Sequence, residues 1–387
     1  MGKKVGIMTF HRAYNYGAAL QAYSLQTILR SMGHASEFVD FKKGTRYTGS
    51  NADGAKKTGL KGLRYFLKTG IAKKTLDSYF KRRNKDFELF HNEYMAIADK
   101  QCIGRRDLAA CLEKYDAVIA GSDQVWNPLL NDGDFCYLLP DGNGFTRISY
   151  AASLGRGSFD GFCCNEQVRE ALRRFDYISV REEGSKEKLE AFVELEKPIE
   201  LTVDPTLLLK ASDFNAVASK RQIRKPYIFL YTVRGLKQTI NGADILSKRT
   251  KLPVYTLMPG SFKKSMLKMN KNTAPGDAGP LGFLAMIRDA DYVVTDSFHG
   301  SVFSVLFNKK VFIVAEKQPD GGLVIDQRLD GLCDLFGIHD RVISADGLKT
   351  AALETEPDWV SIEKKRVQAA EHSLDFLRSA LGDGKLS

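Results

Sequence analysis

The sequence lacks the short motifs that identify many enzyme classes. It contains no P-loop, no G-x-G-x-x-G after its first predicted strand, no H-E-x-x-H and no G-x-S-x-G. Its six histidines show no paired metal-ligand spacing, so we expect neither a bound metal nor metal catalysis. No stretch approaches the roughly 18 apolar residues of a membrane-spanning helix, and the opening MGKKVGIMTF predicts neither a signal peptide nor a membrane anchor.

Cysteine is also scarce and poorly arranged for cross-links. None of the six cysteines forms a C-x-x-C pair, and the adjacent Cys163 and Cys164 have poor geometry for a structural bridge with each other. The other four are Cys102, Cys111, Cys136 and Cys333. This pattern predicts reduced cysteines in a soluble, cytoplasmic protein without a zinc site.

The net charge of +10 comes from one segment of the chain. Between Lys42 and Lys85, 14 basic residues stand against two acidic ones, so this segment carries +12 and the rest of the chain carries −2. No nucleic-acid motif accompanies it, and we expect no nucleic-acid partner. Apolar residues from Leu63 to Tyr94 predict a basic amphipathic helix, which either packs on its own domain or contacts an anionic membrane through residues 42–85.

The length and the apolar pattern predict two α/β halves. The chain has 387 residues, more than the roughly 250 to 300 at which a single core stops growing. Short apolar strands alternate with helical segments throughout, which is typical of parallel sheets. We expect two Rossmann-like domains facing a central cleft. They are residues 1–210, with a basic helical insertion at about 42–95, and residues 211–387, with a last helix that folds back on the first domain.

Two polar loops are expected to line this cleft, because open α/β sheets bind ligands at the carboxyl ends of their strands. The loop after the predicted strand Lys3 to Phe10 contributes His11, Arg12, Tyr14, Asn15, Tyr16 and Gly17. The loop after the predicted strand Tyr115 to Ala120 contributes Ser122, Asp123, Gln124, Trp126 and Asn127. Trp126 has a second interpretation, in which it fills the core.

Residues 291–307, DYVVTDSFHGSVFSVLF, predict a buried strand, a tight polar turn and a short buried helix. The strand is Tyr292 to Thr295, and His299 falls where the helix begins. A helix start offers free N–H groups and a positive dipole end, so it suits an anion. His299 is either a hydrogen-bonded structural histidine or a functional one, and the polar loops expected on the same cleft favour the functional role.

Six segments, in the same order, resemble the polysaccharide pyruvyl transferase family and cover most of the chain outside the basic insertion and the last helix. They are TFHRAYNYGAALQAYSLQ (9–26), AGSDQVWNP (120–128), YAASLG (150–155), SVREE (179–183), VDPTLLL (203–209) and VVTDSFHGSVFSVLF (293–307). The resemblance implies a fold similar to that of GT-B glycosyltransferases. It also implies a reaction in which phosphoenolpyruvate, without a further cofactor, donates pyruvate to a sugar as a ketal.

The resemblance further implies roles for single residues. His299 matches the family's catalytic histidine, and Asp296 is expected to orient it or to stabilise its charge. Ser297 stands where the family tends to carry an arginine, and Arg328 is the expected substitute for that cation. The expected donor-binding residues are Arg181, Ser297, Gly300, Ser301 and Arg328.

Three functions follow from these observations. The first is a bacterial, cytoplasmic pyruvyl transferase of surface-polysaccharide (exopolysaccharide) biosynthesis, which acts on a free or lipid-linked saccharide at the inner membrane face. The second is a sugar-nucleotide-dependent glycosyltransferase on the same GT-B-like architecture. The third is a non-catalytic saccharide-binding or regulatory homologue, which retained the fold after the change at Ser297.

Overall fold

The first half of the chain forms a six-stranded sheet in which neighbouring strands are parallel. The computed structural model describes residues 2–42, 70–131, 135–142, 144–155, 165–233, 236–258 and 272–383. The strand order is β2-β1-β5-β6-β7-β8. The bounds are β1 Lys4–Met8, β2 Ala35–Phe38, β5 Ala117–Asp123, β6 Thr146–Ala152, β7 Tyr177–Val180 and β8 Ile199–Leu201.

The second half repeats this architecture with another six-stranded parallel sheet. Its strand order is β11-β10-β9-β12-β13-β16. The bounds are β9 Ile228–Tyr231, β10 Val254–Thr256, β11 Asn272–Thr273, β12 Tyr292–Thr295, β13 Lys310–Val314 and β16 Val342–Ile343. The two sheets confirm the expected α/β class.

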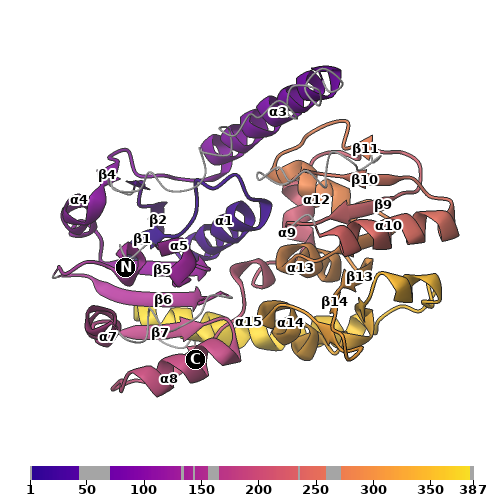
Figure 1. Ribbon diagram of the computed structural model, residues 1–387. Helices are drawn as coiled ribbons and strands as arrows, with labels where there is room; N and C mark the ends of the chain where they lie inside the picture. The colour runs from indigo at the N-terminus through magenta and orange to yellow at the C-terminus, as the bar shows by residue number, and fades with distance from the viewer. Residues whose placement is uncertain are drawn as a thin grey trace, which may run out of the picture.

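Helices cover both faces of each sheet (Figure 1). In the first half they are α1 Tyr16–Ser31, α3 Gly70–Tyr94, α4 Gly104–Leu112, α5 Pro128–Asn131, α7 Glu166–Arg173, α8 Glu183–Phe192 and the 3₁₀ turn η2 Pro205–Leu207. In the second half they are α9 Ala211–Val217, α10 Lys237–Thr250, α12 Pro280–Arg288, α13 Phe298–Leu306, α14 Gln327–Phe336 and α15 Trp359–Leu381. Short elements complete the chain: β3 Phe41–Lys42, β4 Cys102–Ile103, η1 Cys136–Leu138, β14 Glu316–Lys317, β15 Leu323–Val324, η3 His339–Arg341 and η4 Asp346–Lys349.

The central strands of the sheets are mostly apolar because both of their faces are buried. In β12, Val293 belongs to a core cluster with residues of α12 and α13, whereas its neighbour Val294 belongs to a cluster with residues of α10. Successive side chains of a strand point to opposite faces, so a strand between two helical layers needs apolar residues at every position.

The two halves share a hydrophobic core where α1 meets α12 and α13. Tyr16, the first residue of α1, is buried, and its ring stacks on Phe283 of α12 with 4.9 Å between the centroids. Its hydroxyl donates a hydrogen bond of 2.9 Å to the carbonyl of Ala278. This contact places the start of α1 against the second half of the chain.

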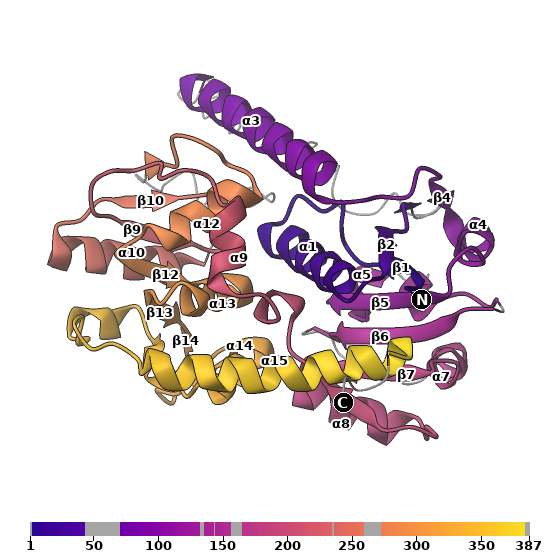
Figure 2. The same ribbon diagram turned by 180° about the vertical axis from the view of Figure 1, so that it is seen from behind.

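The last helix, α15, runs back from the second half across the first (Figure 2). Arg366 donates to the carbonyl of Leu207 at 2.8 Å, and the hydroxyl of Ser373 accepts from the backbone N–H of Val203 at 3.0 Å. Further along, Phe376 packs against Tyr150 of β6. These contacts tie both halves together at the segment that follows β8.

The next observations concern three expectations: the basic insertion, the absence of a membrane-spanning segment and the redox state of the cysteines. Residues 43–69 of the basic insertion lie outside the described residues, whereas α3 forms its last part. Within the part of the chain that the structure describes, no helix is long and apolar enough to cross a membrane. Cys102 and Cys111 form a disulfide, so the expectation that all cysteines are reduced was wrong for this pair, which β4 and α4 bring together.

Candidate active site

The site begins with the turn between β12 and α13. The Ser297 hydroxyl caps α13 by accepting a 3.3 Å hydrogen bond from the Gly300 N–H. The Ser301 hydroxyl donates back to the Ser297 carbonyl at 3.1 Å, and the Ser297 N–H donates to the Thr295 hydroxyl at 3.0 Å. The expected donor residues Ser297, Gly300 and Ser301 therefore build one helix start, whose dipole favours negative charge.

His299 lies in the first turn of α13 and is only 7% exposed. Its Nε2 lies 3.4 Å from Oδ2 of Asp204, within ion-pair distance but without a hydrogen bond in this geometry. Asp204 belongs to the first half of the chain, directly before η2. The site therefore forms where the two halves meet.

Asp204 is buried and bound on both carboxylate oxygens. Oδ1 accepts from the N–H of Thr206 at 3.1 Å and from its hydroxyl at 2.7 Å, and Oδ2 accepts from Arg181 Nη1 at 2.5 Å. Burial alone would raise the pKa of this carboxyl, but His299, Arg181 and the Thr206 hydroxyl hold it well below its usual range. Asp204 is consequently ionised beside the imidazole at neutral pH.

Arg181, at the end of β7, is held by three carboxylates and is fully enclosed, with 3% of its side chain exposed. It lies 2.5 Å from Asp204, 3.0 Å from Glu182 and 3.6 Å from Asp123. Burial lowers its pKa, but these three acids outweigh burial and raise it. The guanidinium also lies over the Phe298 ring, 4.6 Å from its centroid. Arg181 is therefore paired with carboxylates of the protein, whereas the sequence led us to expect that it contacts the anion of a bound donor.

Asp296 does not take the expected place beside His299. Its carboxylate accepts hydrogen bonds from the hydroxyls of Thr232 (2.6 Å) and Thr239 (2.9 Å) and from the N–H of Val233 (3.2 Å). It ties the end of β9 and the start of α10 to the turn, and Asp204 occupies the position that we expected for it. The reason lies in the packing: Asp204 directly precedes η2, which packs against α13, whereas Asp296 is next to β9, the neighbour of β12 in the same sheet.

Arg328, the expected substitute cation, is paired within its own turn. Its Nε and Nη2 each donate to Asp326 at 2.8 Å. The neighbouring Gln327 lies against Gly184, at the start of α8, so this turn is also on the seam between the halves. Arg328 lies near the contact between the two halves, but its guanidinium is already paired with the carboxylate of Asp326.

Of the residues expected in the loop after β1, Gly17 lies at the site, whereas the others make structural contacts. Helix α1 begins at Tyr16, so Tyr16 and Gly17 are helical rather than part of a loop, and Asn15 caps the helix by accepting from Ala18. Gly17 is the residue that reaches His299: a Cβ built on it would lie 2.0 Å from the imidazole Nδ1. Only a glycine fits there without displacing the imidazole.

The other residues of this loop have partners outside the His299 pair. Arg12 forms a two-pronged ion pair with Asp40 at 2.6 and 2.8 Å. The Tyr14 hydroxyl donates to Glu88 of α3 at 2.9 Å, and His11 is buried, with Nδ1 3.1 Å from the Thr9 carbonyl. These contacts hold the loop between β2 and α3.

The end of β5 contributes one residue to the site, Asp123, through its ion pair with Arg181. Trp126 is fully buried and donates to the Tyr137 carbonyl at 3.2 Å, so of its two interpretations the core-filling one holds. Gln124 accepts from Asn127 at 2.9 Å, which closes the loop on itself, and the Ser122 hydroxyl donates to the Ala151 carbonyl at 3.0 Å. These four residues shape the loop that presents Asp123.

Asp204 and Glu182 were missed as site residues, although both lie in segments that carry the family resemblance. A usable signal was present. Each acid lies just beyond the carboxyl end of its strand, β8 and β7 respectively, and these strands are neighbours in the sheet. Acids at the ends of adjacent parallel strands lie close together in space.

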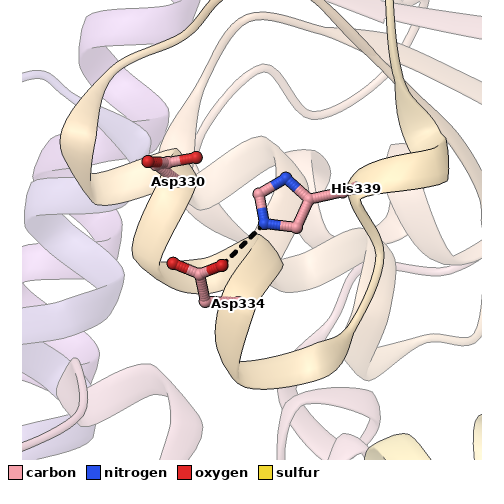
Figure 3. A group of neighbouring side chains, drawn as sticks. All are labelled: Asp330, Asp334 and His339. Atoms are coloured by element: carbon pink, nitrogen blue, oxygen red, sulfur yellow. Dashed lines mark hydrogen bonds and ion pairs between the residues drawn. The ribbon is translucent and has the colours of Figure 1, made fainter.

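A separate group of possible metal ligands lies at the far end of α14 (Figure 3). Asp330, Asp334 and His339 place their ligand atoms within 4.8 Å of one another, and His339 Nε2 lies 2.8 Å from Asp334 Oδ1. All three are exposed. The contact between His339 and Asp334 accounts for their proximity, and we assign no ion to them.

Two buried histidines beside the loop after β1 predict acid sensitivity. Nε2 of His11 and of His91 is buried without a hydrogen-bond partner, and burial lowers the pKa of each from 6.5 to about 4. Below about pH 6.5 the two histidines bind protons in the unfolded chain but not in the folded protein. The free energy of unfolding is therefore highest above pH 6.5 and falls as the pH is lowered toward 4. We expect a loss of up to about 1.4 kcal/mol per pH unit for each histidine.

Urea unfolding at pH 7, 6 and 5 measures this slope. His91→Phe should reduce it by about half, because one of two groups with about the same shift is removed. His339→Phe, which alters an exposed histidine, should leave it unchanged. Equal slopes for His91→Phe and the wild type would contradict the assignment.

Comparison with known proteins gives both a family and a fold. A family model described as "Polysaccharide pyruvyl transferase" matches residues 15–318. No curated protein matches the chain. A co-structure of S. aureus MnaA with UDP is 13% identical, with a TM-score of 0.52 over 99% of this chain and 97% of that one. The UDP-GlcNAc 2-epimerase of Methanocaldococcus jannaschii is 13% identical, with a TM-score of 0.50 over 98% and 100%. These similarities confirm the expected GT-B-like fold.

The arrangement suits proton transfer between a protein and a bound molecule. A buried carboxylate next to an imidazole stabilises the protonated ring, and such a histidine can both donate and accept protons. Here the Asp204 carboxylate lies 3.4 Å from Nε2 of His299, and Nδ1 lies against Gly17. The N-terminus of α13 adds a site where negative charge is favoured.

Proposed function

Because the chain belongs to the polysaccharide pyruvyl transferase family, we propose that it transfers pyruvate from phosphoenolpyruvate to a saccharide as a ketal. The observation that carries the proposal is the Asp204–His299 pair at the start of α13, between the two halves. The GT-B-like fold is compatible with a saccharide acceptor. The donor is phosphoenolpyruvate, with no further cofactor.

The proposed reaction needs one group that handles protons. An acceptor hydroxyl adds to C2 of phosphoenolpyruvate, its proton is removed, and C3 receives a proton to become the methyl group. Phosphate then leaves, and a second acceptor hydroxyl adds to C2 and loses its proton, which closes the ketal ring. His299 serves as the acid and the base in these steps, and Asp204 stabilises the imidazolium that forms between them.

The donor anion binds at the start of α13 in this proposal. Ser297, Gly300 and Ser301 form that helix start, and its dipole end attracts the phosphate or the carboxylate. Arg181 and Arg328 are both occupied by carboxylates. In this proposal the donor is therefore attracted chiefly by the positive dipole end of α13 rather than by an arginine, which is consistent with Ser297 at the position where the family tends to carry one.

The assay is phosphate release from phosphoenolpyruvate in the presence of a panel of saccharides. We expect release by the wild type and a loss of at least about 100-fold in His299→Ala, since general acid–base catalysis contributes about 10²–10⁴-fold. His372→Ala, which alters an exposed histidine of α15, is the matched control and should be fully active. No release with any acceptor would reject the proposed function.

Arg181 and Arg328 are both paired with carboxylates of the protein, and this favours a second candidate function. In this candidate the protein has the same fold but uses a different donor, or no donor. Thermal melting distinguishes the two. Stabilisation by phosphoenolpyruvate supports the pyruvyl transferase, whereas stabilisation by a nucleoside diphosphate alone supports a sugar-nucleotide glycosyltransferase. Saccharide binding that is unaffected by His299→Ala, without stabilisation by either donor, supports a non-catalytic binding protein.

We place the reaction in bacterial surface-polysaccharide biosynthesis, in the cytoplasm and on an acceptor that a lipid carries at the inner membrane face. Contact with anionic lipid through residues 42–85 stays a prediction, because residues 43–69 lie outside the described part. Sedimentation with anionic vesicles at low and high salt tests it, and absence of binding at both would reject it.

A further inference from the structure

Arg83 of α3 is a buried cation. It is 1% exposed, and among the described residues no carboxylate forms an ion pair with it. Its hydrogen bonds go to neutral acceptors, and its guanidinium lies over the Phe87 ring, 4.7 Å from the centroid. Buried charges are usually paired, because leaving one unpaired is costly. The burial of this charged side chain therefore needs an explanation other than packing.

Two of the acceptors flank the turn that leads into α1. Nη2 of Arg83 donates to the carbonyl of Tyr14, and Nε donates to the hydroxyl of Tyr16 at 3.2 Å. Asn15 lies between these residues, and Gly17 follows them. One rigid guanidinium thus binds the backbone of the turn at Tyr14 and the tip of the Tyr16 side chain, which is packed against the second half of the chain.

That turn sets the distance between α1 and the catalytic imidazole. A Cβ on Gly17 would lie 2.0 Å from Nδ1 of His299, so the backbone of α1 is in close contact with the ring. Nε2 is already beside Asp204. The ring is therefore enclosed by Asp204 on one side and by the start of α1, which Arg83 holds, on the other.

The helix that carries Arg83 is also anchored on the second half of the chain. The Tyr79 hydroxyl accepts from Met258 at 3.0 Å, Arg82 donates to the Ala274 carbonyl at 3.1 Å, and Asp86 accepts from Ala278 at 2.9 Å. In both views α3 extends from the side of α1 to the side of α12 (Figures 1 and 2). Arg83 therefore acts from an element fixed to both halves.

We propose that Arg83 is a positioning residue, which holds the turn from Tyr14 to Gly17 so that the start of α1 packs against Nδ1 of His299. The proposal rests on the proposed function for its kinetic readout. It adds an element that the family resemblance did not include, since α3 lies in the basic insertion between the first two motif segments. Helix α3 then links the relative position of the two halves to the proton-transfer group.

The test compares three variants with the wild type. Arg83→Met keeps the length of the side chain but removes the donors, and Arg83→Lys keeps the charge and one donor. Lys85→Met removes an exposed cation from the same helix and is the matched control. The readouts are kcat and KM for phosphate release, and the resonance of His299 in protein with ¹³C-labelled histidine, assigned with His299→Gln.

For Arg83→Met we expect kcat to fall about 10- to 100-fold, because displacements near 1 Å at a reacting group have effects of this size. KM for phosphoenolpyruvate should change less than kcat, and the His299 resonance should shift. Arg83→Lys should restore part of kcat, and Lys85→Met should match the wild type. If Arg83→Met does not fold, Arg83→Lys alone decides, since it should still lower kcat and shift the resonance.

The kinetics and the His299 resonance together distinguish a failure of the proposed function from a failure of the positioning role of Arg83. If the wild type releases no phosphate, the proposed function fails, and the resonance shift in Arg83→Met or Arg83→Lys still tests positioning. If the wild type is active but both variants keep its kcat and the unshifted His299 resonance, positioning fails and the proposed function stands. A loss of melting temperature without either change would also overturn the proposal.

Discussion

Asp204→Asn is expected to lower the rate of phosphate release by about 10²–10⁴-fold, the range that acid–base assistance supplies. The substitution keeps the shape of the side chain and its capping oxygen but removes the charge that lies 3.4 Å from His299 Nε2. An imidazolium formed during the reaction then has no anion to stabilise it. The measurement is kcat in the phosphate-release assay, with folding checked by circular dichroism.

The same variant should change the response of stability to acid. Because His299, Arg181 and Thr206 hold the pKa of Asp204 below its usual range, Asp204 contributes stability above about pH 4. That contribution is lost as the pH falls from the unfolded pKa through the folded one. Asp204→Asn should therefore be less stable at neutral pH and lose less stability below pH 4.

Asp358→Asn is the matched control for this prediction. Asp358 caps α15 by accepting from Ser361 at 3.0 Å, and asparagine caps a helix about as well as aspartate. Its activity and its acid response should equal those of the wild type. Full activity in Asp204→Asn would remove the Asp204–His299 pair from the mechanism.

Much of the fold could be predicted from the sequence because both sheets are parallel and buried. Short apolar runs with polar ends give the position of such strands directly, and Tyr292–Thr295 matches its predicted bounds. The edge strands β11 and β16 have two residues each, too few for a periodic signal, and were not predicted. Local pattern thus predicts the centre of a sheet better than its edges.

The site was harder to predict because its key contact joins residues from different halves. The turn at His299 was recognisable as a strand followed by a helix start, but its carboxylate was assigned to Asp296, which is near in sequence. The structure places Asp204 there, since the packing of η2 against α13 decides the pairing. A tertiary contact of this kind leaves no trace in local propensity.

Arg181 illustrates a second limit of the same kind. A basic residue at the carboxyl end of a strand predicts an anion contact equally well whether the anion is a ligand or a buried acid. The choice depends on how many carboxylates the neighbouring strand ends supply. Here Glu182 is the next residue in the chain, whereas Asp123 at the end of β5 and Asp204 after β8 are brought to Arg181 only by the order of the strands in the folded sheet.

Gly17→Ala is expected to lower kcat by about 100-fold or more while leaving the protein folded. The added methyl group would lie 2.0 Å from His299 Nδ1, so the imidazole must move away from its position between Asp204 and α1. The overlap costs roughly 1–3 kcal/mol, whereas alanine gains up to about 1 kcal/mol over glycine within a helix. The net loss of stability should therefore be small compared with the loss of activity.

Gly331→Ala makes the same change in α14, where an added Cβ meets no atom within 4 Å. It should keep full activity and gain up to about 1 kcal/mol in urea unfolding, which measures the helix contribution without the clash. The difference in kcat between the two variants then isolates the contact with His299. If Gly17→Ala were as active as Gly331→Ala, the imidazole could move freely, and neither Asp204 nor the start of α1 would be positioning it.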